Sequence, residues 1–213
     1  MLCQTNVINL KLNPYNKQLL ISKRLDENMT QVKPIILLDR DGVINQDSDQ
    51  YVKSLDEWIP IPGSIKSIAA LSKAGFKVFV VTNQSGIARG YYDIDTLTAM
   101  HNKMTQLVEA EGGSISGIRY CPHGPDDECD CRKPKAGMIE SIEAELGVNF
   151  EETPAIMVGD SKRDLEAGHA RGCQAALVLT GKGRDTQYKD IDCHFQVYTD
   201  LAAFTLATLY QYS

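Results

Sequence analysis

Residues 35–45, IILLDRDGVIN, decide the fold class. Four apolar residues run directly into Asp39-Arg40-Asp41-Gly42. A short run that is apolar on both faces is typical of a strand covered by helices on both sides, and we expect this strand over residues 34–39. Side chains two residues apart on an extended segment point the same way, so Asp39 and Asp41 should face one site at the strand's carboxyl end. A plain Asp-Gly turn is the alternative.

The same pattern recurs along the chain. Further buried strands are expected at 76–82, 118–121, 155–159 and 175–180, and helices at 64–74, 93–111, 136–146, 162–171 and 199–211. Asp93 is placed to cap the longest helix, and glycines stand where helices should stop, at Gly75, Gly112, Gly147 and Gly172. Strands that alternate with helices predict an α/β fold with a doubly wound parallel sheet. Ligands of such sheets bind outside the carboxyl ends of the strands.

Composition narrows the class of protein. The 213 residues are 43% apolar, which suits one domain, expected over residues 34–213. Residues 1–33 form an N-terminal extension of uncertain role, either a mis-assigned start near Met29 or an added strand or partner-binding arm. No apolar run approaches the roughly 20 residues that cross a bilayer, and the start lacks an apolar signal core, so we expect a cytoplasmic protein without a membrane partner. The net charge of −6 argues against nucleic acid.

Polar residues follow two other predicted strands. Thr82 begins a run of small polar residues, and Asp160 comes directly after the fourth strand, with Asp164 one helical turn later. Each could be an ordinary turn or cap. Together with Asp39, Asp41 and Lys133, however, they place a nucleophile, an acid/base, phosphoryl-oxygen donors and an oxygen-ligand Mg²⁺ site at one rim. That set is what phosphoryl transfer through an aspartyl phosphate needs.

A cysteine-rich loop precedes the lysine. Cys121, His123, Cys129 and Cys131 offer three thiolates and one imidazole, a set suited to tetrahedral structural Zn²⁺. A thiol-rich loop without metal is the alternative. Disulfides are disfavoured in a reducing compartment, and a nucleophilic cysteine lacks a second histidine to activate it. Bound zinc would rigidify the chain just before Arg132 and Lys133.

Four motifs in this order carry a resemblance to a known family. DRDGVIN, VVTNQSG, CRKP and VGDSKRD resemble the motifs of the haloacid dehalogenase superfamily of phosphatases, over about residues 34–185. The zinc loop resembles the histidinol-phosphatase-like group, which has little or no cap domain. Within that group, TNQSGIARGYY, CPH and CDCRKPKAGM resemble the heptose bisphosphate phosphatases. We therefore expect a Rossmann-like core with no large cap domain and with a zinc-binding loop.

The resemblance implies a role for each residue at the rim. Asp39 is the expected nucleophile, and Asp41 the expected acid/base that protonates the leaving alcohol and then activates water. Thr82 and Lys133 would hold the phosphoryl oxygens. Mg²⁺ would be bound by the Asp39 carboxylate, the main-chain carbonyl of Asp41, and Asp160.

The resemblance also implies the substrate, a sugar bisphosphate. Arg132 would recognise the phosphate that does not react, since a bidentate guanidinium suits that task. The stretch after the first strand would touch the sugar, although it could be only a solvated loop. The expected substrate-binding residues are Asp47, Ser48, Asp49, Gln50, Tyr51, Asn83, Gln84, Ser85 and Arg132.

The activity implied is removal of the C7 phosphate of a heptose 1,7-bisphosphate by a monomer, in ADP-heptose and lipopolysaccharide core synthesis. The alternatives are a histidinol-phosphate phosphatase or another small phosphomonoesterase, and a catalytically silent scaffold that binds a protein through its zinc loop. One departure from the family is Ser161, which follows Asp160 where many heptose enzymes place a lysine. Lys162 is the expected substitute.

Overall fold

The computed structural model describes residues 32–213, and within them Lys33–Ser213 form one compact unit. The expected N-terminal extension, residues 1–33, lies almost entirely outside the described residues. The expected main domain, residues 34–213, lies within the described part.

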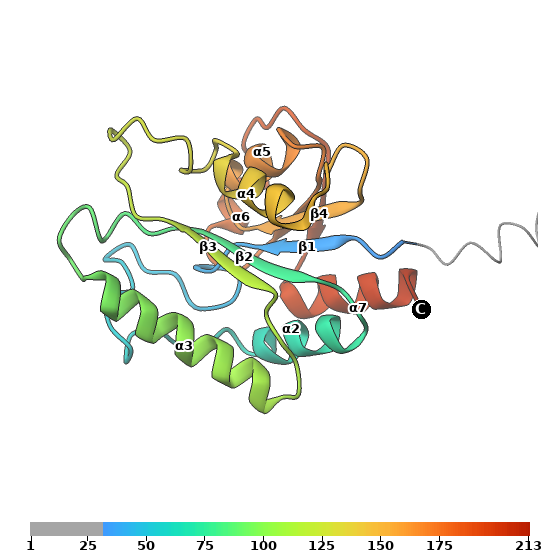
Figure 1. Cartoon of the computed structure of the whole chain (residues 1–213), viewed down its shortest axis with the longest axis horizontal. Coiled ribbons are helices and arrows are strands. Elements are labelled where there is room, and N and C mark those ends of the chain that lie inside the picture. Colours follow the sequence, from blue (N-terminus) through green and yellow to red (C-terminus); the bar gives the residue numbers. More distant parts are fainter. Residues whose placement is uncertain (1–31) are drawn as a thin grey trace, which may run out of the picture. The chain divides into compact units, whose positions relative to one another are not determined.

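Six parallel strands form one sheet in the order β3-β2-β1-β4-β5-β6 (Figure 1). The sheet grows outward from β1 to β3 on one side and from β4 to β6 on the other. The order therefore reverses between β1 and β4, and this reversal opens a crevice at their carboxyl ends. The strands are β1 (Ile35–Leu38), β2 (Val78–Asn83), β3 (Gly117–Cys121), β4 (Ala155–Gly159), β5 (Gln174–Val178) and β6 (Phe195–Tyr198).

Helices cover both faces of this sheet (Figure 1). One face carries α2 (Ser64–Lys73), α3 (Ile94–Ala110) and α7 (Leu201–Gln211), and the other carries α4 (Gly137–Leu146) and α5 (Lys162–His169). A single turn, α6 (Gly183–Thr186), follows β5. The fold is thus the doubly wound α/β arrangement that the sequence predicts.

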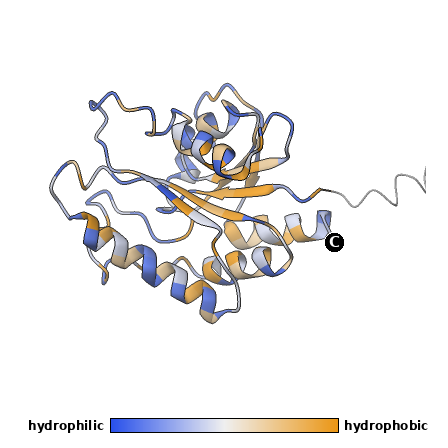
Figure 2. Ribbon diagram, viewed as in Figure 1, coloured by the Kyte–Doolittle hydropathy of each residue, from blue (hydrophilic) through white to orange (hydrophobic). Residues whose placement is uncertain are grey.

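Alternation along β1 divides the core into two layers. Ile36 and Leu38 belong to the apolar cluster under α2, α3 and α7, whereas Ile35 and Leu37 belong to the cluster under α4 and α5. β1 is accordingly apolar along its whole length, and so are the first four residues of its neighbours β2 and β4 (Figure 2). Each fully buried aliphatic side chain contributes about 1.5–3 kcal/mol. This double burial is why a run such as IILL forms an inner strand, and it holds the strand end that carries Asp39 in a fixed place.

The predicted elements are confirmed, with bounds that agree to within two residues. The expected helix stops, Gly75, Gly112, Gly147 and Gly172, all have positive φ, and the Asp93 carboxylate accepts a hydrogen bond from the Thr96 amide at 2.8 Å. The structure adds β6 and α6, which the pattern did not indicate. The residues of β6 are exposed or half-buried, because it is an edge strand, and it therefore lacks a buried apolar run.

Residues 39–63 connect β1 to α2 through turns and two isolated bridges, Asp41 with Asn45 and Asn45 with Pro60. No cap domain interrupts the described chain, as expected. Within residues 32–213, no helix has the length and apolar composition to traverse a membrane.

Candidate active site and metal-binding loop

Most of the expected site residues meet at the carboxyl end of the sheet. They line a cavity of about 190 Å³ beside the reversal of strand order. The expected residues that line it are Asp39, Asp41, Asp47, Ser48, Asp49, Tyr51, Asn83, Gln84, Ser85 and Arg132. Thr82, Lys133 and Asp160 are buried, and Gln50 does not line the cavity.

Lys133 is a buried cation beneath the cavity. Its ammonium lies 2.9 Å from Asp39 Oδ1 and 2.7 Å from Asp164 Oδ1, and it donates to the main-chain oxygen of Val81 at 2.6 Å. The main-chain amide of Arg40 also donates to Asp39 Oδ1, at 2.7 Å. Lys133 and this amide both engage Oδ1, and none of the described residues donates a hydrogen bond to Oδ2.

Three carboxylates gather around this lysine. Oxygens of Asp39, Asp160 and Asp164 lie within 4.8 Å of one another, and all three residues are buried. Burial and the charge of Asp164 raise the pKa of Asp39 to about 6, although Lys133 opposes the shift. Burial, Asp164 and Asp39 raise the pKa of Asp160 to about 8. The three carboxylates therefore outnumber the two cations that act on them, Lys133 and Arg163.

A divalent cation would supply the positive charge that these carboxylates lack. Asp160 Oδ2 accepts from the Lys182 amide at 2.8 Å, and a Cβ on Gly42 or Gly181 would overlap the same oxygen. The two glycines thus form a close cradle around one oxygen of Asp160. Carboxylate oxygens are the ligands that Mg²⁺ prefers, so the donor set fits Mg²⁺ between Asp39 and Asp160.

Asp164 supports the site and is not itself placed as a ligand. Its Oδ1 is taken by Lys133, and its Oδ2 accepts from the Ser161 amide at 3.0 Å and the Ser161 hydroxyl at 2.5 Å. The bond from the Ser161 amide is part of the capping box at the start of α5. Lys133, Arg163 and these hydrogen bonds hold the pKa of Asp164 below its usual range, in spite of its burial. Asp164 is therefore an anionic anchor for Lys133.

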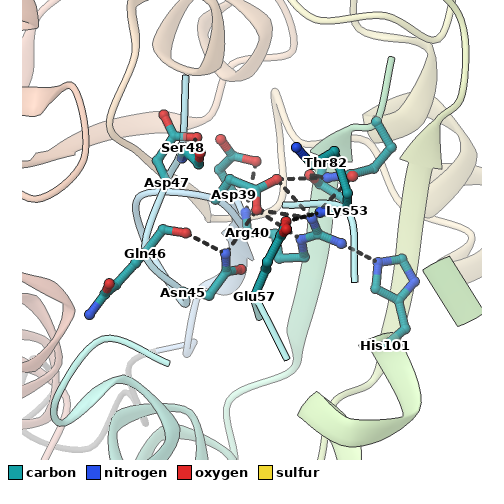
Figure 3. Close-up of polar contacts among 12 residues, drawn as sticks. Asp39, Arg40, Asn45, Gln46, Asp47, Ser48, Lys53, Glu57, Thr82 and His101 are labelled. Carbon is teal, nitrogen blue, oxygen red and sulfur yellow. Dashed lines mark hydrogen bonds and ion pairs between the residues drawn. The ribbon is translucent and has the colours of Figure 1, made fainter. Parts of the chain in front are cut away.

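Asp41 faces a different environment from Asp39. One nitrogen of the Arg40 guanidinium lies 2.9 and 3.0 Å from its two oxygens, and the amide groups of Asn45 and Gln84 donate to it at 2.9 and 2.7 Å. These donors lower the pKa of Asp41 despite its burial. Figure 3 shows the Arg40 guanidinium with the ring of His101 beyond it. The burial of Arg40 was not predicted from the sequence.

The polar residues at the end of β2 and just after it make different contacts. The Thr82 hydroxyl is buried and accepts from the Gln84 amide group at 2.8 Å. Asn83 exchanges two hydrogen bonds with the main chain of Lys133, both at 3.1 Å. Asn83 therefore ties the end of the cysteine-rich loop to β2, and this contact places Lys133 beneath the cavity. Ser85 lines the cavity and is nearly buried.

The loop at residues 47–51 forms the opposite wall. Lys182 lies 3.2 Å from Asp47 and 3.8 Å from Asp49, and so connects this loop to the end of β5. The Tyr51 ring packs 5.0 Å from that of Tyr91 and beneath the Arg89 guanidinium at 5.8 Å. These contacts give the loop a fixed place against two neighbouring segments.

Four cavity residues that carry a polar group are not among the expected site residues: Arg89, Tyr92, Arg163 and Lys182. Lys182 follows β5, so the rule that ligands bind at strand ends could have indicated it. Lys162, the expected substitute for a lysine after Asp160, turns away: it donates to Asp190 O at 2.6 Å and pairs with Glu166 at 3.5 Å. Its neighbour Arg163 lines the cavity in its place.

The cysteine-rich loop forms a compact four-residue cluster. Cys121 Sγ lies 3.6 Å from Cys129 Sγ and 3.2 Å from Cys131 Sγ, and His123 Nδ1 lies 3.6 Å from Cys121 and 3.3 Å from Cys131. The sulfur atoms are too far apart for disulfides, whose bond is about 2.05 Å. Tetrahedral zinc with bonds of about 2.0–2.3 Å has ligand separations of roughly 3.5–3.8 Å, close to these distances. The cluster therefore fits Zn²⁺.

Known proteins resemble the chain over most of its length. A HAD-hydrolase-like family model matches residues 130–204. The D-glycero-beta-D-manno-heptose-1,7-bisphosphate 7-phosphatase of Pseudomonas aeruginosa is 55% identical over 177 residues, which are 83% of this chain and 98% of the relative.

Two crystal structures of D,D-heptose 1,7-bisphosphate phosphatases are also similar. The enzyme of B. bronchiseptica, complexed with magnesium and phosphate, has 48% identity and a TM-score of 0.79, covering 84% of this chain and 99% of its own. The enzyme of Burkholderia thailandensis has 41% identity and a TM-score of 0.64, covering 83% and 99%. With its motifs in this geometry, the chain belongs to the D-glycero-beta-D-manno-heptose-1,7-bisphosphate 7-phosphatase family, phosphoric monoester hydrolases with a haloacid dehalogenase-like fold.

Proposed function

We propose that the protein removes the C7 phosphate of D-glycero-β-D-manno-heptose 1,7-bisphosphate, with Mg²⁺ as cofactor and an aspartyl phosphate as intermediate. The observation that carries the proposal is Asp39 itself. One of its oxygens is paired with Lys133, the other receives no hydrogen bond from residues 32–213, and the residue lines a polar cavity. The names of the similar proteins supply the substrate, including the β anomer and the position of the phosphate.

The first step forms an Asp39–phosphorus bond and breaks the bond between phosphorus and the C7 oxygen. Lys133 and Thr82 bind phosphoryl oxygens, and Asp41 gives its proton to the departing alkoxide. In the resting protein the pKa of Asp41 is lowered. The phosphoryl group brings negative charge beside Asp41, and a like charge raises a carboxyl pKa, so we expect substrate binding to favour the protonated form.

The second step returns the nucleophile. Asp41, now a carboxylate, takes a proton from water as the water oxygen attacks phosphorus, and the Asp39–phosphorus bond breaks to release inorganic phosphate. Asp39, Asp160 and the Asp41 carbonyl would hold Mg²⁺, which would neutralise charge on the phosphoryl oxygens. Asp164 keeps Lys133 in place throughout, because it is buried and paired with it.

The remaining cavity residues bind the rest of the substrate. Arg132, which donates to the His123 carbonyl at 3.1 Å, extends from the zinc loop to the cavity and suits the C1 phosphate. The loop at residues 47–51, with Asn83 and Ser85 opposite, would contact the sugar. In this proposal Zn²⁺ is structural and is bound by Cys121, His123, Cys129 and Cys131. By holding this loop, it would fix the positions of Arg132 and Lys133.

In this proposal the working unit is a monomer. The product, a heptose 1-phosphate, is an intermediate suited to nucleotide activation, so we place the enzyme in ADP-heptose and lipopolysaccharide core synthesis in the cytoplasm.

A substrate panel tests the proposal. Purified protein with Mg²⁺ is given the β and α anomers of heptose 1,7-bisphosphate and histidinol phosphate, and phosphorus NMR identifies which phosphate is lost. We expect the β anomer to have the highest kcat/KM, with loss of the C7 phosphate alone. A preference for histidinol phosphate, or loss of the C1 phosphate, would contradict the proposal. Absence of phosphate release from every ester would favour the scaffold alternative.

A further inference from the structure

Gln84, an expected substrate-binding residue, uses its whole hydrogen-bonding capacity inside the protein. Its amide nitrogen donates to Asp41 Oδ2 at 2.7 Å and to the Thr82 hydroxyl at 2.8 Å. Its carbonyl oxygen accepts from Arg40 at 3.0 Å and from the Tyr92 hydroxyl at 2.6 Å. A glutamine has two amide hydrogens and two acceptor sites, so nothing is left for a sugar or phosphate. The side chain is also only 3% exposed.

Tyr92 fixes which way the Gln84 amide faces. Because the hydroxyl donates to the carbonyl oxygen, the amide nitrogen is turned toward Asp41 and Thr82. The aromatic ring lies so close to Gly86 that a Cβ there would overlap it. Gly86 and Tyr92 both belong to the run TNQSGIARGYY. The contact between them explains why a glycine occupies position 86 when a tyrosine occupies position 92. Gly86 leaves space for the ring, and the ring delivers a hydroxyl to Gln84.

Asp41 is thereby held by donors on both oxygens. Arg40 and Asn45 donate to Oδ1, and Arg40 and Gln84 donate to Oδ2. Arg40 is itself fully buried and lies 3.4 Å from His101 Nε2 on α3. The carboxyl group also lines the cavity, and these donors fix its plane.

We propose that Gln84 and Tyr92 are positioning residues that orient Asp41 for proton transfer to the leaving alcohol, and that Gln84 does not bind substrate. The inference rests on the proposed function, because it assumes that Asp41 is the acid. Neither residue touches the reacting atoms. They act by holding one carboxyl group in the plane from which its proton can reach the C7 oxygen.

The dependence on leaving group separates this role from a structural one. A sugar alkoxide is a poor leaving group and needs the proton, whereas p-nitrophenolate departs without it. The value of kcat/KM reports the steps up to the first irreversible one, here phosphorylation of Asp39. A misoriented Asp41 should therefore lower kcat/KM for sugar phosphates and spare p-nitrophenyl phosphate.

The experiment measures kcat/KM of the full chain with Mg²⁺ for three esters: the heptose bisphosphate, a sugar monophosphate and p-nitrophenyl phosphate. Tyr92→Phe removes one hydroxyl and keeps the ring, and should lower both sugar rates by about three- to tenfold, the range for one neutral hydrogen bond. Gln84→Met keeps the shape and loses all four bonds, and should lower both by about a hundredfold. With Tyr92→Phe, the rate with p-nitrophenyl phosphate should change by less than about twofold. Gln84→Met also loses the bond to Thr82, so its p-nitrophenyl phosphate rate should fall, but by much less than its two sugar rates.

Two companion variants make the result specific. Tyr91→Phe removes the hydroxyl of the neighbouring exposed tyrosine and should change none of the rates. Arg132→Ala should lower the bisphosphate rate but spare the monophosphate, which has no second phosphate. If Tyr92→Phe and Gln84→Met reduce all three rates by equal factors, or only raise KM for the sugars, the positioning role is wrong. If wild-type protein hydrolyses p-nitrophenyl phosphate but neither sugar ester, the proposed function fails instead.

Discussion

At the scale of single residues, Lys133 connects three parts of the fold. Its ammonium contacts Asp39 after β1, Asp164 on α5 and the carbonyl of Val81 in β2. Burial opposes its charge, but Asp164 and Asp39 raise its pKa, so it stays an ammonium. Removal of one partner of such a buried pair typically costs about 3–5 kcal/mol. The position of the nucleophile therefore depends on residues from two other elements.

Gly42 offers a test of the cradle around Asp160. It has φ of 83°, and a Cβ would overlap the Asp160 carboxylate. We expect Gly42→Ala to displace this carboxylate, weaken Mg²⁺ binding and reduce kcat at least tenfold. The measurement is activity as a function of Mg²⁺ concentration.

Gly147→Ala is the matched control for this change. Gly147 also has a left-handed φ, of 65°, but a Cβ there would meet no atom within 4 Å, and the residue ends α4 away from the cavity. The substitution should lower stability by about 1 kcal/mol and leave the Mg²⁺ dependence unchanged. Equal effects of the two variants on Mg²⁺ dependence would mean that backbone strain alone, and not the clash with Asp160, explains the loss.

Arg132 should distinguish a bisphosphate from a simple ester. Loss of a charged hydrogen bond to the second phosphate costs roughly 1.5–3 kcal/mol, or about ten- to a hundredfold in kcat/KM. Arg132→Ala should therefore lower turnover of heptose 1,7-bisphosphate by this factor and barely affect p-nitrophenyl phosphate. Arg119→Ala, which breaks contacts with Glu145 and Ser141 outside the cavity, is the control. Equal losses on both esters would place Arg132 at the reacting phosphoryl group or in the support of the zinc loop.

At the scale of elements, the inner strands and their helices could be predicted from the sequence. A strand that is covered by helices on both faces is a short continuous run of apolar residues, and such runs are easy to recognise. The end of β1 could be predicted for the same reason, since Asp39 follows a fully apolar run. The edge strand β6 could not, because its side chains are partly exposed. Contacts between distant segments also leave no local pattern. The bond from Arg40 to Gln84 joins the segment after β1 to the segment after β2, which only the folded sheet brings together.

The cysteine-rich loop is the element whose structure depends most on a metal. None of residues 122–130 is buried, so packing stabilises the loop little, and zinc binding supplies folding energy in such loops. We expect about one zinc per chain by metal analysis. Cys129→Ser should lose zinc, soluble yield and activity together, because Arg132 and Lys133 follow the loop directly. Cys193→Ser, outside the cluster, should keep the zinc. Zinc-free protein with full activity and stability would overturn a structural role for the metal.

At the scale of the whole molecule, the carboxylate cluster links stability to pH. The pKa of Asp160 is raised from 3.8 to about 8, so the folded protein without metal holds a proton that the unfolded chain releases. The stabilising contribution of this proton is complete below about pH 4 and is lost as the pH rises toward 8. Mg²⁺ replaces the proton, so it should stabilise the protein most at the upper end of this window.

Thermal unfolding with and without millimolar Mg²⁺ measures this effect. The increase in Tm on adding Mg²⁺ should grow from about pH 5 to about pH 8, roughly as expected for ligand binding to the native state alone. Asp160→Asn removes the titrating group and one ligand, and should flatten the dependence. A Tm shift that is the same at every pH would contradict a Mg²⁺ site between Asp39 and Asp160.

The central claim is that Asp39 accepts the phosphoryl group and that Asp41 is needed to release it. It is tested most directly by rapid mixing of Asp41→Asn protein with p-nitrophenyl phosphate and Mg²⁺. The first step needs no acid with this ester, whereas the second needs the Asp41 base. We predict a burst of about one p-nitrophenolate per chain, with phosphate retained on the protein and slow turnover afterwards. Absence of a burst, or an equal burst from the Asp39→Asn/Asp41→Asn double variant, would contradict the account.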